Sequence, residues 1–268
     1  MIEEKGAPTP EGAMIEAKAP EDRAQMRRAI VYSVLGGLCP LIPVPFVDDV
    51  VLTHLNRRYV RGIFRDGSRG ISDAQLKALV DGPSKGALGC LVNFVLYPIK
   101  KIFKKIFFFL SIKDCVDVAS RLFHQGVLLR QAIEGGHLGA GAGAVSDEAL
   151  ERVREAMGAT MEEVDTRPIN QLLGRLFTGG RLWTRRAARM VWGRVREARR
   201  SSEASSGEAL DVSDVAESAE LSKAVEAFER AVWTESDYLE ALARHFERKI
   251  AGGARPDQES SAGDPVEP

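Results

Sequence analysis

The sequence has 268 residues, 44% of them hydrophobic and 28% charged, and its formal net charge at pH 7 is −1. This composition is ordinary for a globular chain, and the length allows one large helical domain or two small ones. Its three widely spaced cysteines (Cys39, Cys90 and Cys115) exclude a disulfide framework and indicate small buried side chains in a reducing compartment.

The near-zero net charge hides a strong asymmetry along the chain. Residues 30–113 hold 12 Lys and Arg against 5 Asp and Glu, and residues 181–200 hold 8 Arg against one Glu. Residues 201–268 hold 6 bases against 16 acids. This pattern predicts basic surfaces that bind an anionic partner, or basic surfaces that the acidic tail screens within the chain.

Residues 1–20 are rich in Pro, Gly, Ala and Glu, which predicts a disordered leader. No basic segment followed by an apolar one is present, so we expect no signal peptide and a location on the cytoplasmic side. A helix is expected from about Glu21, and the pair Gly36 and Gly37 is expected to break it.

The run from Ile30 to Val47 has no charged residue and reaches the lower length limit of a membrane-spanning helix. Its prolines exclude one straight span, because each removes a backbone donor and clashes with the preceding turn. We expect instead an elbow formed by Pro40, Pro43, Pro45, Asp48 and Asp49. It is either a re-entrant turn at a membrane or a buried loop between helices. Its aspartates either bind a metal ion or proton, or favour the start of the next helix.

The next segment, residues 48–66, has the period of an amphipathic helix. Val51, Leu55, Tyr59 and Ile63 form an apolar stripe at i, i+4 spacing, and arginines occupy the other side. Ser72 with Gln75 three positions later predicts a capping box, and therefore a short helix that ends near residue 82.

Residues 86–112 combine a long apolar run with two lysine pairs four residues apart. We expect an interfacial helix that places apolar groups at the acyl boundary and ammonium groups on anionic lipid. The predicted membrane contacts are Phe94, Leu96, Tyr97, Ile99, Lys100, Lys101, Phe103, Lys104, Lys105, Phe107, Phe108 and Phe109. Two alternatives remain open, namely a core helix whose lysines face water and a shallow hairpin that dips into the membrane.

The apolar pattern continues until Glu134, Gly135 and Gly136, so that residues 21–136 form one apolar and basic helical region. Residues 137–145 are expected to be a Gly/Ala linker. Residues 146–200 are expected to be helical, with Ser146 as a cap, Thr160 and Glu163 as a second capping box, and a further helix from Pro168.

The helical region ends in an arginine-rich helix with two tryptophans. Its predicted anion-binding residues are Arg181, Trp183, Arg185, Arg186, Arg189, Trp192 and Arg194. Interleaved Arg and Trp suit the phosphates of lipid or nucleic acid. The alternative is a solvated basic face that pairs with the acidic carboxyl-terminal helices.

The remainder is expected to comprise a Ser-rich linker at 201–213, an acidic helical pair at 214–251 and a disordered tail at 252–268. The second helix of the pair is expected to have Thr234 and Asp237 at its start. No strand-like alternation of useful length is present. The sequence therefore predicts an all-α fold, an irregular helical bundle with amphipathic, membrane-seeking helices and disordered termini.

No catalytic constellation stands out. The four histidines (His54, His124, His137 and His245) lack the spacing of a metal motif, and the glycine-rich stretch near residue 140 lacks the lysine of a phosphate loop. We therefore expect no enzyme activity, no metal site and no cofactor.

The stretch LCPLIPVPFVDDVVLTHLNRRYVRGI, together with the apolar run 86–110, resembles the bacterial membrane-associated helical families of the EcsC and YcjF type. The resemblance covers about residues 28–135 and depends on Pro43, Pro45, Asp48 and Asp49. It implies an accessory role at a membrane rather than a reaction, and it carries over no catalytic residue.

These observations favour a non-enzymatic accessory or scaffold protein that docks on the cytoplasmic face of an anionic membrane and binds a protein partner. The main alternative is a soluble helical interaction module whose apolar runs form its own core. Two further alternatives are an enzyme that uses Asp48 and Asp49 on a lipid-like substrate, and a nucleic-acid binder, which the acidic tail argues against.

Overall fold

The computed structural model describes residues 20–41, 47–81, 104–139, 143–179, 186–191, 193 and 219–252, with side chains for all of these except 20, 47–48, 81, 104–111 and 220. The described chain is all-α, as the sequence predicts. Its helices are α2 (Pro20–Leu38), α3 (Val47–Asp66), α4 (Asp73–Asp81), α6 (Lys104–Glu134), α7 (Asp147–Glu163), α8 (Arg167–Gly179), α11 (Ala219–Thr234) and α12 (Ser236–Gly252). A 3₁₀ turn, η1 (Cys39–Leu41), follows α2, and residues 186–191 are also helical.

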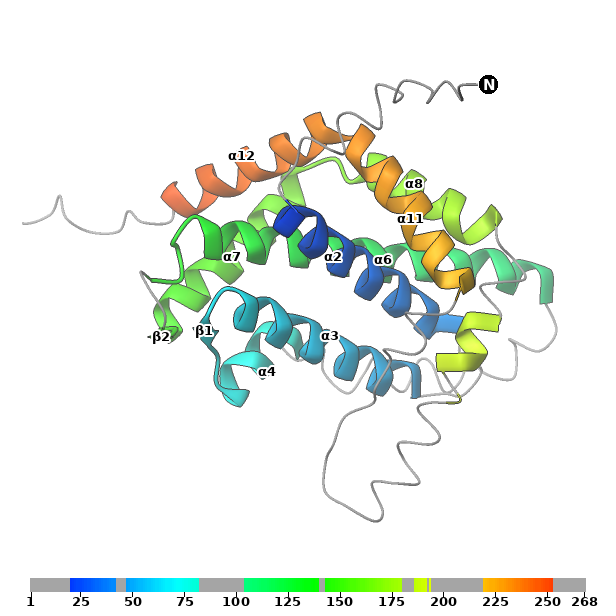
Figure 1. Cartoon of the computed structure of the whole chain (residues 1–268), viewed down its shortest axis with the longest axis horizontal. Helices are drawn as coiled ribbons and strands as arrows, with labels where there is room; N and C mark the ends of the chain where they lie inside the picture. Colours follow the sequence, from blue (N-terminus) through cyan, green and yellow to red (C-terminus); the bar gives the residue numbers. More distant parts are fainter. Residues whose placement is uncertain are drawn as a thin grey trace, which may run out of the picture.

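The centre of the fold is α6, with α2 packed along it in the opposite direction (Figure 1). At one end of the pair the side chain of Asp22 contacts Arg130, and at the other end Gly37 approaches the backbone of Cys115. Around this pair lie α3 and α4 on one side and α7, α8, α11 and α12 on the other (Figure 1).

The helix α2 begins at Pro20, where the missing N–H costs nothing, and it has two acids in its first turn that favour the positive helix end. The expected break at Gly36 and Gly37 is wrong, because α2 continues to Leu38. A Cβ on Gly37 would lie 2.6 Å from the Phe177 ring and 2.9 Å from the Ala119 Cβ. The two glycines therefore permit close helix packing instead of ending the helix.

The described apolar side chains form two cores. The first lies between α2, the amino-terminal parts of α3 and α6, α8, residues 187 and 191, and α11. The second lies between the remaining parts of α3 and α6, α4, α7 and α12. Because α6 contributes to both, the region expected over 21–136 and the later helices share their cores.

Several local predictions are confirmed. In the capping box before α4, the Ser72 backbone N–H donates to Gln75 Oε1 at 2.9 Å, and the Gln75 N–H donates to Ser72 Oγ at 3.2 Å. Ser146 caps α7 by accepting from the Ala149 N–H at 3.2 Å. After α6, Gly136 adopts a φ of 72°.

Three expectations about the later connections differ from the structure. The expected linker 137–145 is ordered where it is described, because β2 (Gly143–Ala144) pairs in parallel with β1 (Arg69–Gly70) and Val145 is buried. Thr160 starts no new helix; it lies within α7 and its hydroxyl donates to the Ala156 carbonyl at 2.7 Å. Thr234 is the last residue of α11 rather than the start of the next helix.

The expected disordered leader 1–20 and tail 252–268 are described only at Pro20, the first residue of α2, and Gly252, the last residue of α12. Their other residues and the expected linker 201–213 lie outside the described residues. Within the described part of the chain, no helix is both long enough and apolar enough to cross a bilayer.

Candidate functional site

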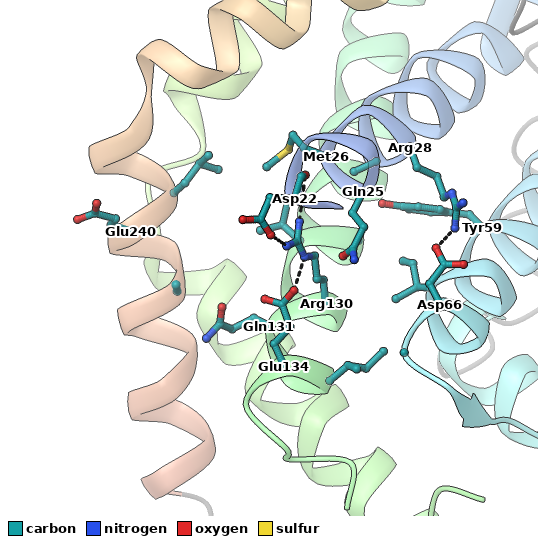
Figure 2. A pocket seen from close by; sticks show the side chains of 18 of the residues that line it. Asp22, Gln25, Met26, Arg28, Tyr59, Asp66, Arg130, Gln131, Glu134 and Glu240 are labelled. Atoms are coloured by element: carbon teal, nitrogen blue, oxygen red, sulfur yellow. Dashed lines mark hydrogen bonds and ion pairs between the residues drawn. The ribbon is translucent and has the colours of Figure 1, made fainter. Parts of the chain in front are cut away.

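A pocket of about 480 Å³ opens beside the amino-terminal end of α2, where this helix lies between α3 and α12 and in front of α6 (Figure 2). Its polar lining consists of Asp22, Gln25, Arg28, Tyr59, Asp66, Arg130, Gln131, Glu134, Ser236 and Glu240. Its apolar lining includes Met26, Ala29, Ile63, Val127, Ile133, Trp233 and Leu239.

Arg130 on α6 ties the first turn of α2 to the pocket floor. Its guanidinium contacts the Asp22 carboxylate, and its Nε donates to Glu134 Oε1 at 2.6 Å (Figure 2). A further contact joins Arg130 Nη1 to the Asp22 backbone carbonyl at 3.4 Å. One guanidinium thus holds two carboxylates and one carbonyl, which fixes the start of α2 on the end of α6.

On the other side of α2, Arg28 pairs with Asp66 at the end of α3 (Figure 2). Both side chains are about one-third exposed. At such exposure an ion pair adds little to stability, and its main effect here is to place two charged groups at one wall of the pocket.

Tyr59 is the most deeply buried polar group of the lining, with 1% of its surface exposed. Its ring stacks on Tyr32 at a centroid distance of 4.8 Å. Its hydroxyl lies against Gly126, where an added Cβ would come within 1.6 Å of the oxygen. Burial raises the pKa of Tyr59, so the phenol stays protonated.

The pocket lining has more carboxylates than guanidiniums. Four carboxylates (Asp22, Asp66, Glu134 and Glu240) accompany two guanidiniums, a net charge of −2 for these six groups. The lining includes neither a cysteine nor a histidine, and hence no pairing of a nucleophile with a basic imidazole. The polar groups of the lining can bind a polar ligand through charge and hydrogen bonds.

A second polar cluster is buried between α6 and α12. His124 is fully buried, its Nδ1 donates to the Ser120 carbonyl at 2.7 Å, and its Nε2 accepts from the Tyr238 hydroxyl at 2.5 Å. A carbonyl only accepts, so these contacts define the neutral tautomer. Burial lowers the pKa of His124 to about 4, despite the opposing hydrogen bond to Ser120. This cluster links two helices and does not line the pocket.

The predicted membrane contacts lie largely outside the described residues. Those from Phe94 to Phe103 are outside, and the last five (Lys104, Lys105, Phe107, Phe108 and Phe109) belong to the first turns of α6, of which only the backbone is described. Other apolar residues of the segment from Ile30 to Ile112 are buried in the protein, among them Ile30, Val34, Val51 and Leu55.

Of the five predicted elbow residues, only Pro40 and Asp49 have described side chains. Pro40 lies half-buried in η1, whereas Pro43 and Pro45 lie outside the described residues. Asp48 and Asp49 are the second and third residues of α3, and the Asp49 side chain is exposed. Their place favours the interpretation that they stabilise the start of the helix. No group of three or more potential metal ligands occurs among the described residues.

Only two of the seven predicted anion-binding residues have described side chains. Arg186 and Arg189 are exposed on the helix at 186–191, which buries Ala187 and Val191 in the first core. Arg181, Trp183, Arg185, Trp192 and Arg194 lie outside the described residues.

The sequence analysis did not single out the pocket residues Asp22, Arg28, Tyr59, Asp66 and Arg130 as a site. A usable signal was present for Arg130, which together with Gln131 interrupts the apolar stretch 127–133 of α6. An arginine in such a position indicates a carboxylate partner on a neighbouring helix, although the sequence does not say which one.

No protein-family model, curated protein or solved structure matches this chain. The resemblance of residues 28–135 to the EcsC and YcjF families therefore stays a prediction.

Proposed function

We propose that this chain is a non-enzymatic helical accessory protein that docks on the cytoplasmic face of an anionic membrane and binds a protein partner. The docking segment is the lysine- and phenylalanine-rich run 94–109, and the partner's polar group is held in the pocket beside α2. The resemblance of residues 28–135 to membrane-associated families has the same implication.

The continuity of α6 is the observation that supports this proposal most strongly. One helix of 31 residues carries Lys104 and Lys105 in its first turn and enters the first core with Cys115 and Ala119. The eleven helical steps from Lys104 to Cys115 span about 16 Å at 1.5 Å per residue. A lipid contact made by the first turns would therefore be joined rigidly to the helical body.

The exposed surface of the described body supports a protein that folds without lipid. Val50, 54% exposed, is the one large hydrophobic side chain among the described residues that is classed as exposed. A body of this kind would bind a membrane through a local segment and through charge, as peripheral proteins do.

The proposal is tested by removing the two lysines of α6. In co-sedimentation with vesicles of equimolar phosphatidylcholine and phosphatidylglycerol, Lys104→Gln with Lys105→Gln should weaken binding roughly twentyfold, about fivefold per lysine. The matched control is Lys77→Gln with Lys223→Gln, which removes the same charge from exposed positions on α4 and α11. If both double variants bind vesicles like the wild type, or lose binding equally, the assignment of the run 94–109 as the docking segment is wrong.

A soluble interaction module is the second candidate, and the burial of apolar residues of α2 and α3 favours it. The apolar stripe of α3 faces the protein, because Val51, Leu55 and Tyr59 are all at most 2% exposed. This candidate predicts that the wild type stays in the supernatant with the same vesicles at low salt, while the pocket still binds its partner.

A further inference from the structure

A second hollow, of about 450 Å³, lies at the carboxyl-terminal end of α3. It is open to solvent and is lined by Arg61, Arg65, Ser68, Arg69 and Ile71. Three of its five lining residues are arginines and none is acidic.

A tight turn brings the third arginine back to the other two. The Gly67 N–H donates to the Ile63 carbonyl and the Ser68 N–H to the Arg65 carbonyl, both at 3.0 Å. Ser68 has a φ of 56°, in the left-handed region that non-glycine residues seldom adopt. The chain then enters β1, where Arg69 is aligned with Gly143 of β2. The sheet thus fixes the backbone of Arg69 beside the end of α3.

One exposed carboxylate pairs with an arginine of the hollow. Arg61 Nη2 contacts Asp73 Oδ1 at 2.6 Å, but this carboxylate is 91% exposed. The exposed guanidinium of Arg65 has no partner among the described residues. The three guanidiniums of the hollow and this one carboxylate carry a net charge of +2.

The same face of α3 extends the positive field towards the start of the helix. After desolvation by burial, the largest causes that lower the pKa of His54 are the charges of Arg58, Arg57 and Arg61. Arginines near a helix carboxyl terminus also favour the helix dipole, but that effect is limited to the last turn and does not explain a row that begins at Arg57.

We propose that this basic hollow binds the phosphate group of an anionic membrane lipid. Guanidinium groups match the oxygens of a phosphate through paired hydrogen bonds, and Ser68 supplies a hydroxyl at the same place. The hollow is too open to enclose a small soluble ligand, which a binding pocket normally buries almost completely. A headgroup presented by a surface needs no such enclosure. The choice of a lipid as the source rests on the proposed membrane function.

The experiment compares two charge-matched double variants of the full chain. Arg61→Gln with Arg65→Gln removes the two α3 arginines of the hollow, and Arg152→Gln with Arg175→Gln removes two exposed arginines from α7 and α8. Circular dichroism checks that both remain helical. With equimolar phosphatidylcholine and phosphatidylglycerol vesicles, the first variant should lose binding about fivefold per arginine, and the second should bind nearly as the wild type does.

The outcomes separate this inference from the proposed docking segment. Suppose that the Arg61 and Arg65 variant weakens vesicle binding and the Lys104 and Lys105 variant does not. The basic hollow is then a lipid-binding site, and the run 94–109 is not the docking segment. The inference is overturned if the two arginine variants bind vesicles alike.

Two further probes identify the source of the phosphate. Titration with inorganic phosphate, followed by the amide signals of Ser68 and Arg69, should give only weak binding. The lipid assignment is overturned if inorganic phosphate saturates the wild type tightly while the vesicles do not bind. It is overturned equally if the hollow variant loses retention on single-stranded DNA but keeps its vesicle binding.

Discussion

At the scale of single residues, glycines decide how closely the central helices approach. A Cβ on Gly36 would lie 2.1 Å from a Leu122 methyl group, and one on Gly37 would meet Phe177 and Ala119 within 3 Å. Gly126 has the same role for Tyr59. At each of these positions an atom from another helix occupies the space that a side chain would fill. The glycines are therefore part of the core.

We predict that Gly37→Ala destabilises the protein by about 1–3 kcal/mol, because the added methyl group overpacks the contact with α6 and α8. The control is Gly158→Ala in α7, where an added Cβ meets nothing within 4 Å. This change should stabilise by about 0.5–1 kcal/mol through helix propensity. Urea denaturation measures both, and a neutral Gly37→Ala variant would contradict the close packing.

The buried His124 makes stability depend on pH. Its folded pKa of about 4 is below the unfolded value of 6.5, so the unfolded chain binds the proton more tightly. The stability contributed by the neutral ring is therefore present above pH 6.5 and is lost as the pH falls towards the folded pKa. From about pH 7 to about pH 5 this loss amounts to about 2 kcal/mol.

We therefore expect His124→Gln to flatten the dependence of the unfolding free energy on pH in this window. Some slope should remain, because burial also lowers the pKa of His54. The measurement is urea denaturation of wild type and variant at several pH values. Equal slopes for the two proteins would show that His124 is not buried as a neutral ring.

At the scale of elements, α6 is the helix that takes part in both hydrophobic cores. Its first half packs in the core with α2, α8 and α11, and its second half packs in the core with α4, α7 and α12. Neither the early nor the late helices enclose a core without it. The chain is therefore expected to unfold as one unit over the described helices, although its sequence suggested separate regions.

This arrangement predicts that residues 143–252 do not fold alone. Without α2 and α6, the apolar faces of α8, α11 and α12 lose most of their partners, and short isolated helices are marginal in water. Circular dichroism of this fragment should show much less helix per residue than the full chain. A fragment with native helicity and a cooperative thermal transition would contradict the shared cores.

The elements that the sequence predicts well are those with local causes. The capping residues Ser72, Gln75 and Ser146 and the stop at Gly136 act within one turn of the backbone, and the structure confirms them. The wrong predictions at Gly36, Gly37 and Thr160 have non-local causes. A glycine that breaks an isolated helix is favoured where another helix must come close, and that neighbour is distant in the sequence.

At the scale of the whole molecule, the charge asymmetry is partly resolved by contacts between distant segments. Arg27 of α2 lies 3.9 Å from Glu226 and 3.4 Å from Glu229 of the acidic helix α11. The sequence suggested that the acidic helices pair with the arginine run at 181–200. The described part of the chain shows α2 as one partner of α11, whereas most of the arginine run lies outside the described residues, so its pairing with the acidic helices stays a prediction.

The candidate pocket shows why a binding site is harder to predict than a helix. Asp22, Tyr59 and Arg130 belong to three helices that lie far apart in the chain, and each alone fits an ordinary helix surface or core. The antiparallel pairing of α2 with α6, and the packing of α3 against both, bring them together. The arginines of the basic hollow on α3 were easier to predict, because the spacing of the arginines along one helix is visible in the sequence.

The central claim is that a helical body folded without lipid docks on anionic membranes through charge. The most direct measurement is co-sedimentation of the full chain with two kinds of vesicle, phosphatidylcholine alone and equimolar phosphatidylcholine with phosphatidylglycerol. We expect binding to the anionic vesicles only, and its loss at about 1 M salt, where the Debye length falls to about 3 Å. Recovery of the protein in the supernatant with both vesicles at low salt would contradict the account.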